Sequence, residues 1–532
     1  MSAFPGHLQA LLSARGYPHP VRTVELIETH VSWILLTGEY AYKIKRPLQY
    51  SFVDQRTLER RRFLCHEEVR LNRRFAPELY LGVCPIAERA GEAQVEGAGP
   101  VIEYAGKMRQ FLRSEELDSL LETTRLEPTE LEAFGHELAR IHTRLPVAQP
   151  GEDRGHPPAL ATLILGNIEE CARAGKAVGW SLDLRPLAAA LEALVESTAR
   201  LRSQRLANGR VRECHGDLHA CNIVRCGSRL VAFDCLEFDA RLRWIDVADE
   251  IAFLLTDLDV RQRPLHAQAF LNGYLSESGD YQGCALLPLF RAHRALVRAK
   301  ITALRAAQAN TSGADVDAAR SQYEAYVDGA RREVAPMRPI LVLMCGLSGS
   351  GKTWLARRLA PALAAVHLRS DIERKRLAGL SAMDRTDSPV AQGLYSRAAS
   401  ERVYNRLAEC AADTLRGGYT SIVDATFGRA ESRSHFRDLA KLLGVRTCVV
   451  YCHAPRQVLE TRIVERQRRQ HDASEADLAV LAWQERYFEP PESHEASAVL
   501  DAQNPAPSAI EALIQRITAL SASMNGKSPS LR

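Results

Sequence analysis

Residues 339–353 read PILVLMCGLSGSGKT, and this stretch organises the second half of the chain. Pro339 is followed by six apolar residues, which predict a buried strand, and then by a glycine-rich turn and the start of a helix. The glycines let backbone N–H groups converge on phosphate oxygens, because a Cβ at these positions would block the approach. The stretch therefore predicts an anion-binding turn between a strand and a helix.

The turn has the complete GxxxxGKT spacing of a phosphate-binding loop, in the strand-turn-helix context that the pattern requires. We expect Lys352 to supply a charge to the β and γ phosphates of ATP, and Thr353 to supply a hydroxyl to Mg²⁺. The other nucleotide-binding positions of the loop are Gly346, Ser348, Gly349, Ser350 and Gly351. A glycine-rich turn with an incidental lysine is the alternative, and the strand before the loop argues against it.

Strand and helix patterns alternate from the loop to about residue 500. The predicted strands are 366–368, 421–424, 445–452 and 499–500, and the predicted helices include 401–415 and 433–443. This alternation predicts a parallel sheet covered by helices on both faces, with ligands at the carboxyl ends of the strands.

Two carboxylates follow predicted strands of this sheet. Asp371 lies just after the second strand, beside the loop, where an acceptor hydroxyl would arrive. Asp424 ends the next strand and is placed to organise Mg²⁺ or its water shell. The alternative for Ser370 and Asp371 is that they only cap the helix that follows.

Three arginines, Arg462, Arg466 and Arg469, lie at spacings of four and three on a predicted helix. One face of that helix therefore points three guanidinium groups the same way. Arginine on a closing segment stabilises charge on a transferred phosphoryl group. A solvated helix face in an arginine-rich protein is the alternative.

The first part of the chain predicts a small sheet with one helix. Its candidate strands are 24–27, 33–36, 40–44, 80–86 and 101–108, with a helix at 58–75 and a glycine-rich loop near 91–99. Lys43 lies in the third strand and Lys45 directly after it, and Glu67 and Glu68 lie in the helix. Residues 115–207 and 247–334 are mostly helical in pattern.

Asp217, Asn222 and Asp234 lie within eighteen residues, on a loop and at the end of a strand. Phosphoryl transfer requires a carboxylate that orients the attacking hydroxyl and oxygen ligands for Mg²⁺, and this order supplies both. One alternative is that Asp217 and His215 only tie the loop to its neighbours by hydrogen bonds. Another is a Zn²⁺ site, whose candidate ligands are Cys214, His215, His219 and Cys221. Their crowding suits neither a CxxC knuckle nor an HExxH helix.

The stretch HGDLHACN, residues 215–222, resembles the HGDxHxxN catalytic loop of the aminoglycoside phosphotransferase (APH) and choline kinase branch of the protein-kinase-like fold. The resemblance implies Asp217 as catalytic base, and Asn222 and Asp234 as Mg²⁺ ligands. It also implies that Lys43 meets the α and β phosphates and pairs with Glu68, with Lys45 and Glu67 as rivals. Residues 108–110 would form the hinge at the adenine. The chain departs from the pattern in lacking a glycine-rich loop between the first two strands, and in carrying Glu250 where an Asp is usual.

The second half resembles the P-loop kinases that include polynucleotide kinase, gluconate kinase, chloramphenicol phosphotransferase and zeta toxins. This resemblance implies Asp371 as base, with Arg462 and Arg466 in a lid. The whole chain, with FLCHEEVRLN at 63–72, resembles bacterial bifunctional aminoglycoside phosphotransferase-like and ATP-binding proteins. The expected fold is an N-terminal α+β protein-kinase-like (APH) domain, 1–335, and a C-terminal α/β P-loop kinase domain, 336–520. A disordered tail, 521–532, is expected after them.

Composition excludes several classes of protein. A net charge of +4 over 532 residues does not indicate a nucleic-acid partner, and no apolar run is long enough to predict a membrane span. The twelve cysteines form no CxxC pair, which favours free thiols in a reducing cytoplasm, and the N-terminus does not resemble a secretory signal.

These patterns lead to one main hypothesis and two rivals. The main hypothesis is a cytoplasmic, ATP- and Mg²⁺-dependent phosphotransferase (kinase) that acts on a hydroxyl of a small molecule and has two nucleotide sites. The first rival makes one module a nucleotide-sensing regulator of the other. The second rival is a nucleic-acid end kinase, which the charge supports weakly. The sequence leaves the acceptor and the oligomeric state open.

Overall fold

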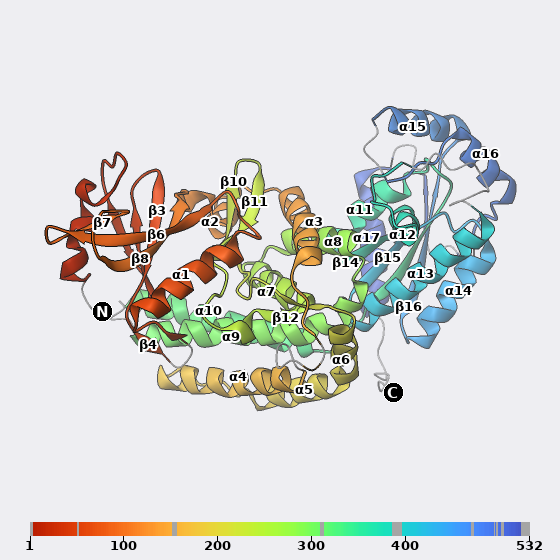
Figure 1. Cartoon of the computed structure of the whole chain (residues 1–532). Helices are drawn as coiled ribbons and strands as arrows, with labels where there is room; N and C mark the ends of the chain where they lie inside the picture. The colour runs from red at the N-terminus through yellow and green to blue at the C-terminus, as the bar shows by residue number, and fades with distance from the viewer. Residues whose placement is uncertain are drawn as a thin grey trace. The chain divides into compact units, whose positions relative to one another are not determined.

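The computed structural model describes residues 4–50, 53–149, 151, 157–308, 313–385, 396–469, 473–493, 495, 498–501 and 505–522 (Figure 1). The chain divides into two compact units. The first unit consists of Met1–Glu130, Ile141–Leu163 and Ala199–Asp257, and the second of Leu131–Arg140, Ile164–Thr198 and Leu258–Arg532. Several helices that precede residue 336 therefore belong to the same unit as the C-terminal sheet. The predicted domain limits of 1–335 and 336–520 stay predictions.

An antiparallel six-stranded sheet of order β1-β2-β3-β8-β6-β7 opens the first unit. Its strands are β1 (Glu25–Glu28), β2 (Ser32–Leu36), β3 (Tyr40–Lys45), β6 (Tyr80–Arg89), β7 (Glu92–Val95) and β8 (Val101–Arg109). Helix α1 (Leu58–Asn72) begins after Thr57, whose side chain accepts a hydrogen bond from the Arg60 N–H and so satisfies one of the free amides of the first turn. The helix packs against β8 and β6, which matches the predicted sheet with one helix.

Strand β7 corrects the loop predicted near residues 91–99. Ala90 and Gly91 both have a positive φ, 55° and 84°, so the chain reverses tightly and β7 pairs with β6. Ala93 and Val95 are buried, in the alternating pattern of a half-buried strand. The glycines flank this strand rather than occupy it, which hid the strand from the sequence pattern.

The rest of the first unit contains two short pairs of antiparallel strands, with a loop between them. Strand β9 (Val211–Glu213) pairs with β12 (Trp244–Asp246), and β10 (Ile223–Cys226) pairs with β11 (Arg229–Ala232). The remaining strands, helices and 3₁₀ turns before residue 260 are β4 (Gln49–Tyr50), β5 (Val53–Asp54), α2 (Leu117–Glu122), α3 (Pro128–Arg144), α4 (Pro157–Ala177), α5 (Arg185–Ser197), α6 (Ala199–Ala207), α7 (Val247–Val260), η1 (Gly6–Leu12), η2 (Ala14–Gly16), η3 (Arg113–Glu115), η4 (Ala220–Asn222) and η5 (Ala240–Leu242).

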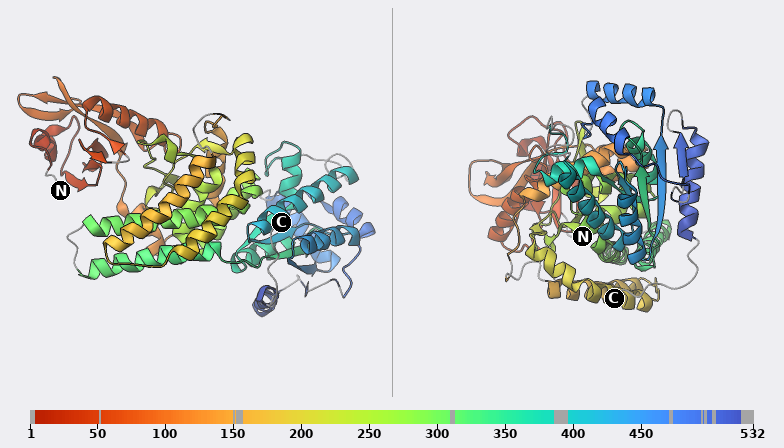
Figure 2. Two further views of the ribbon diagram at one scale, coloured as in Figure 1. Left: turned by 90° about the horizontal axis from the view of Figure 1, so that it is seen from below. Right: turned by 90° about the vertical axis from the view of Figure 1, so that its right-hand side faces the viewer.

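The second unit begins with residues 131–140 of α3, residues 164–177 of α4, and α5. After residue 257 it continues with the helices α8 (Pro264–Ser278), α9 (Leu287–Gln308) and α10 (Gly313–Val334), and with the 3₁₀ turn η6 (Tyr281–Leu286). Helices α9 and α10 pack along each other, as Figures 1 and 2 show. Helix α8 lies so close to α3 that a Cβ on Gly273 would sit 2.2 Å from the Glu132 carbonyl oxygen, so only glycine fits there.

A parallel five-stranded sheet of order β14-β15-β13-β16-β17 follows, as the alternating pattern predicted. Its strands are β13 (Ile340–Cys345), β14 (Ala365–Arg369), β15 (Thr420–Asp424), β16 (Arg446–His453) and β17 (Ala498–Asp501). The helices are α11 (Lys352–Ala362), α12 (Ser370–Leu377), α13 (Arg397–Arg416), α14 (Ala430–Leu442), α15 (Arg456–Arg469), α16 (Leu478–Tyr487) and α17 (Pro507–Ala522). Helices α16 and α17 have no counterpart among the predicted elements. Helix α17 includes the first two residues of the predicted tail, and 523–532 lie outside the described residues.

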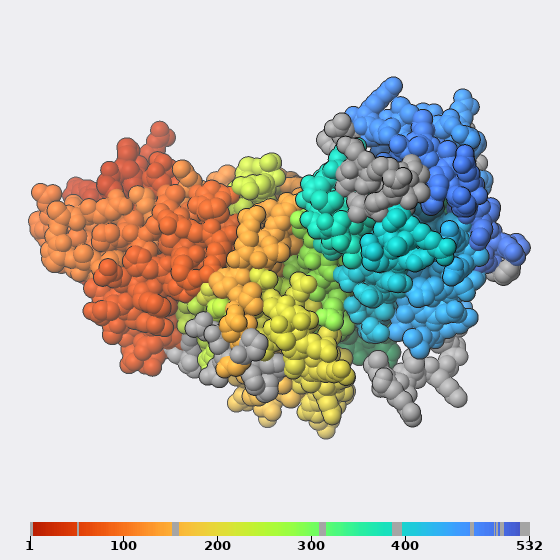
Figure 3. All heavy atoms as spheres, turned by 45° about the vertical axis from the view of Figure 1, so that its right-hand side comes forward, coloured from red at the N-terminus to blue at the C-terminus, as the bar shows by residue number. Residues whose placement is uncertain are grey.

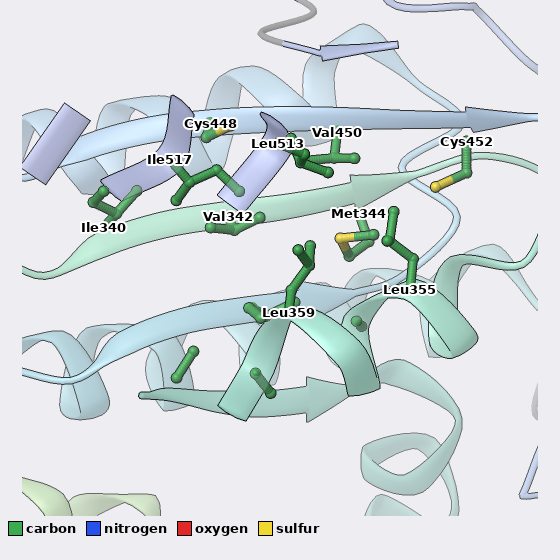
Figure 4. Close-up of a cluster of buried hydrophobic side chains, with 14 of the residues drawn as sticks. Ile340, Val342, Met344, Leu355, Leu359, Cys448, Val450, Cys452, Leu513 and Ile517 are labelled. Carbon is green, nitrogen blue, oxygen red and sulfur yellow. The ribbon is translucent and has the colours of Figure 1, made fainter. Parts of the chain in front are cut away.

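The core of this sheet is apolar on both faces. Val342 and Met344 pack with Leu355 and Leu359 of α11 and with α17 on one face (Figure 4). Helices α13 and α14 contact the sheet as well, and their residues form part of the teal-to-blue surface in Figure 3. Each fully buried Leu or Met contributes roughly 1.5–3 kcal/mol, which holds the loop after β13 on a rigid base. No described helix is long and apolar enough to cross a membrane.

Candidate functional sites

Lys43 is the centre of the first site, which also contains Glu68, Asp217, Asn222 and Asp234. The lysine lies on β3, between β2 and β8, and its Nζ is 2.7 Å from Glu68 Oε1 on α1. It also forms an ion pair with Asp234 Oδ1. Burial by itself would lower the pKa of Lys43, but the charges of Asp234 and Glu68 raise this pKa well above its usual value. The lysine therefore stays charged between two carboxylates.

Lys45 points to the same side of β3 and shares Glu68 with Lys43. Its Nζ lies 2.6 Å from Glu68 Oε2 and also pairs with Glu237, and the side chain is fully buried. Burial favours the neutral form of Glu68, but the two lysines outweigh it and lower the pKa of Glu68 to about 2. Glu67, the rival of Glu68, pairs instead with Arg70 and Arg243. Of the two lysines, Lys43 is the one that contacts Asp234.

The loop after β9 brings Asp217 and Asn222 into contact. Asn222 Nδ2 donates to Asp217 Oδ2 and to the Asp217 carbonyl oxygen, both at 2.9 Å. Asp234 follows β11, with a positive φ of 65°, and its N–H donates to the Tyr80 hydroxyl at 3.0 Å. The Phe233 N–H donates to the Asn222 carbonyl oxygen at 2.9 Å, so the hairpin holds these segments side by side.

His215 supports this loop from inside the protein. Its Nε2 lies 2.8 Å from the Phe233 carbonyl oxygen, and its Nδ1 accepts from the Asp217 N–H at 3.3 Å. Burial lowers the pKa of His215 to about 4, so the ring is neutral near pH 7. Glu250, which the sequence analysis left without a role, accepts from the His215 and Gly216 N–H groups at 2.6 and 3.0 Å.

These contacts disfavour the zinc site among the four Cys and His residues at 214–221. Cys214 Sγ is directed at the Ile245 carbonyl oxygen, and Cys221 Sγ at Asp118. His215 uses both ring nitrogens within the loop. Cys214 and Glu250 do lie near the buried His142, within ligand-like distances. Both Glu250 oxygens, however, already accept backbone N–H groups.

The phosphate-binding loop has the backbone that its glycines predict. Gly346, Gly349 and Gly351 have φ values of 145°, 81° and 85°, a region that side-chain-bearing residues rarely adopt. A Cβ on Gly346 would lie 2.2 Å from the Cys452 carbonyl oxygen. The loop then leads into α11, whose N-terminus adds a partial positive charge.

A cavity of about 590 Å³ opens in front of this loop and defines the second site. The cavity is lined by Lys352 and by all the catalytic and metal-binding residues predicted for this half of the chain, which are Thr353, Asp371, Asp424, Arg462 and Arg466. Ser348, Gly349 and Gly351 line it too. Gly346 and Ser350 shape the loop from behind, and Ser350 is buried.

Lys352, which is half-buried, and Asp424, which is buried, are the charged residues behind the phosphate-binding loop. Burial lowers the pKa of Lys352, and its Nζ donates to the Leu347 carbonyl oxygen at 2.8 Å. Asp424 Oδ2 lies 3.1 Å from His367 Nε2. Burial would raise the pKa of Asp424, but the hydrogen bond from His367 and the charges of His367 and Lys352 hold it far below its usual range. Asp424 therefore remains an anion inside the protein.

The structure gives contacts that bear on both alternatives left open for the residues around this cavity. Arg369, rather than Ser370 or Asp371, occupies the N-cap of α12, and no side chain caps that helix within the described residues. Arg462 Nη1 lies 3.4 Å from the Gly349 carbonyl oxygen, and Arg466 donates to the Ala476 carbonyl oxygen at 2.7 Å. Both arginines therefore face the cavity rather than only solvent. The side chain of Arg469 lies outside the described residues.

Several cavity residues were missed by the sequence analysis. Helix α16 contributes Trp483, Gln484 and Tyr487, and Gln484 Oε1 accepts from the Ser348 N–H at 2.9 Å. No motif marks this helix. The far wall adds further polar side chains, Arg374, Arg397, Ser400, Tyr404, Asn405, Arg429 and His435. Three of those on α13, Arg397, Ser400 and Tyr404, recur at spacings of three and four, the one available signal of a common helix face.

Comparisons with known proteins agree with this two-part arrangement. Residues 61–287 match the phosphotransferase enzyme family, and residues 341–491 match the AAA domain family. An uncharacterized protein of Mycobacterium tuberculosis is 31% identical over 467 residues, which is 87% of this chain and 91% of the relative.

Two solved structures are similar to parts of this chain. A choline/ethanolamine kinase family protein from Mesorhizobium loti has a TM-score of 0.34 and 13% identity over 60% of this chain and 92% of its own. A sugar kinase from Janibacter has a TM-score of 0.27 and 20% identity over 35% of this chain and 98% of its own. The chain thus belongs to the family of its mycobacterial relative, and it combines an N-terminal phosphotransferase-family (APH) domain with a C-terminal P-loop kinase-like domain.

Proposed function

We propose that this protein is an ATP- and Mg²⁺-dependent phosphotransferase that acts on a hydroxyl of a small molecule and has two nucleotide sites. The observation that supports this most is the second site. There a phosphate-binding loop, a half-buried lysine and two carboxylates line one cavity of about 590 Å³, a volume typical of small-ligand sites. The phosphotransferase-family match and the Lys43–Glu68–Asp234 cluster support the first site in the same way.

The donor atoms suit a hard divalent cation. Asn222 and Asp234 at the first site, and Thr353 and Asp424 at the second, offer oxygen atoms, which are the ligands that Mg²⁺ prefers. Mg²⁺, when bound, supplies positive charge at the phosphate oxygens. Lys43 and Lys352 hold the phosphates, and Arg462 and Arg466 stabilise the charge of the transferred group. Asp217 and Asp371 orient the acceptor hydroxyl and take its proton.

The acceptor is best sought with the full-length chain. We would screen a panel of hydroxylated metabolites for ATP consumption, with Asp217→Asn, Asp371→Asn and the double variant beside the wild type. Loss of a general base lowers the rate by about 10²–10⁴-fold, so each single variant reports whether its site performs the transfer. Undiminished consumption by the double variant would refute the proposal. If only Asp217→Asn lowers the rate, the second site is a nucleotide sensor.

A further inference from the structure

The outer edge of β14 is closed by side chains of helix α8. The Ala365 carbonyl oxygen accepts from Gln268 Nε2 at 2.6 Å and from Asn272 Nδ2 at 3.1 Å. The His367 N–H donates to Asn272 Oδ1 at 2.9 Å. The Asn272 amide thus satisfies both a donor and an acceptor of the edge strand, as a neighbouring strand would.

The middle of β14 reaches the second site from that edge. His367 is on β14, and its Nε2 lies 3.1 Å from Asp424 Oδ2 at the end of β15. The side chains of the two residues are only 9% and 5% exposed. A shift of β14 along α8 would therefore move the hydrogen-bond donor of a buried carboxylate in the cavity.

The C-terminus of α8 contacts α12, the helix that carries Asp371, the second carboxylate of the cavity. The carbonyl oxygens of Ser276 and Glu277 accept from Arg376, and that of Gly279 accepts from Arg406 at 2.9 Å. These are the carbonyls that a helix end leaves unsatisfied. Both arginines also bind Glu373.

Glu373 is the buried centre of that contact. Its carboxylate lies 3.1 Å from Arg376 and 3.3 Å from Arg406, and the residue is fully buried. Glu373 follows Asp371 by two residues in α12. The end of α8 therefore sets where the first turn of α12 lies, and with it the wall of the cavity that carries Asp371.

We propose that helix α8 is a positioning element of the second site, in which Asn272 and His367 hold Asp424, and the last turn of α8, through Arg376, Arg406 and Glu373, holds Asp371. Helix α8 lies within residues 61–287, which match the phosphotransferase family. A helix within the range matched by the N-terminal family thus contacts two elements that carry residues of the C-terminal site. The effect of α8 on catalysis rests on the proposed function. The role of α8 in holding β14 and α12 does not.

Hydrogen exchange on the full chain without ligand tests whether α8 holds β14 and α12 in place. Asn272→Leu keeps the size of the side chain and removes both bonds to β14. We expect amides of β14 and the start of α12 to exchange roughly ten-fold faster, because each lost bond lowers the cost of local opening. Amides of β16, on the far side of β13, keep their rates. The exposed Asn208→Leu is the matched control. Unchanged exchange in β14 would overturn the proposal, whatever the protein catalyses.

The positioning role needs a second measurement. In a full chain that carries Lys43→Ala, so that only the second site binds nucleotide, we would titrate ATP with and without Mg²⁺. Loss of a residue that supports a metal ligand costs about 10–100-fold in metal affinity or activity. Asn272→Leu and His367→Leu should both weaken the Mg²⁺-dependent part of binding and leave binding without Mg²⁺ unchanged. His367→Gln, which keeps an N–H donor, should restore it.

Should Asn272→Leu not fold, Arg376→Met removes the contact with the end of α8 and leaves the edge of β14 intact. It should speed exchange in α12 and lower acceptor-dependent turnover without weakening ATP binding. Faster exchange together with unaltered Mg²⁺ dependence and unaltered turnover would reduce α8 to a structural support and overturn the positioning role. A wild type that binds no ATP would refute the proposed function, while the exchange experiment would still decide the inference.

Discussion

The two candidate sites place their lysines in opposite environments. Lys43 is held by Glu68 and Asp234, and its pKa is raised. Lys352 is half-buried, donates a hydrogen bond to the Leu347 carbonyl oxygen, and has a lowered pKa. The first site therefore holds its lysine in ion pairs with two carboxylates, whereas the lysine of the second site donates to a backbone carbonyl oxygen. The two sites thus balance their positive charge differently, and the following changes test that contrast.

The largest effect is expected from Glu68→Gln. Glu68 is buried between Lys43 and Lys45, and its neutralisation leaves two buried lysines with one carboxylate fewer. Breaking a buried ion pair costs about 3–5 kcal/mol, which we expect as a loss in the free energy of unfolding measured with urea. Glu324→Gln removes an exposed pair with Arg320 and should cost at most about 1 kcal/mol. Equal losses would mean that the ion pairs do not hold the first site together.

Acid should loosen the first site through His215. The folded-state pKa of His215 is lowered to about 4, so the unfolded chain takes up a proton near pH 6.5 that the folded chain refuses. Stability is therefore lost as the pH falls from about 6.5 to about 4, by an amount on the order of 3 kcal/mol. Urea midpoints at several pH values should show this slope, and His215→Asn should flatten it. The exposed His7→Asn should keep the slope; if His215→Asn keeps it as well, the assignment fails.

Nucleotide binding should depend strongly on Lys352. Lys352→Ala removes a charged donor worth about 1.5–3 kcal/mol, which corresponds to roughly a 10–100-fold weaker ATP affinity at the second site. Calorimetric titration of the full chain should then lose one of two binding events. Lys441→Ala, which removes an exposed lysine paired with Asp438, should leave both events in place. Two undisturbed events in Lys352→Ala would move the nucleotide away from the loop.

A smaller and opposite change is expected from Gln484→Ala. The Gln484 carbonyl oxygen occupies the Ser348 N–H, which a phosphate oxygen would otherwise accept from. One neutral hydrogen bond is worth about 0.5–1.5 kcal/mol, so its removal should strengthen ATP binding at the second site by roughly 2–10-fold. The exposed Gln457→Ala on α15 should have no effect. Weaker binding in Gln484→Ala would show that the side chain holds the nucleotide instead of competing with it.

Much of the second domain was predictable because its signals are local. The strand at Ile340–Cys345 has the same limits in prediction and structure, since an apolar run bounded by Pro339 and Gly346 admits little else. The glycines at 346, 349 and 351 likewise report backbone conformations that other residues rarely adopt. Helix α16 was missed because Gln484 belongs to no motif, and its importance comes from a contact across 136 residues of chain.

The sequence by itself determined the two folds, the phosphate loop, and the residue types available for catalysis. Each of these depends on the spacing of residues that are close to one another along the chain. Only the tertiary structure decided that Glu68 rather than Glu67 meets Lys43, that Lys45 shares the same carboxylate, and that His367 holds Asp424. It also joined α8 to β14 and α12. These are contacts between residues far apart along the chain, and their partners are selected by burial and by the need to pair every buried charge and polar group, which no local pattern records.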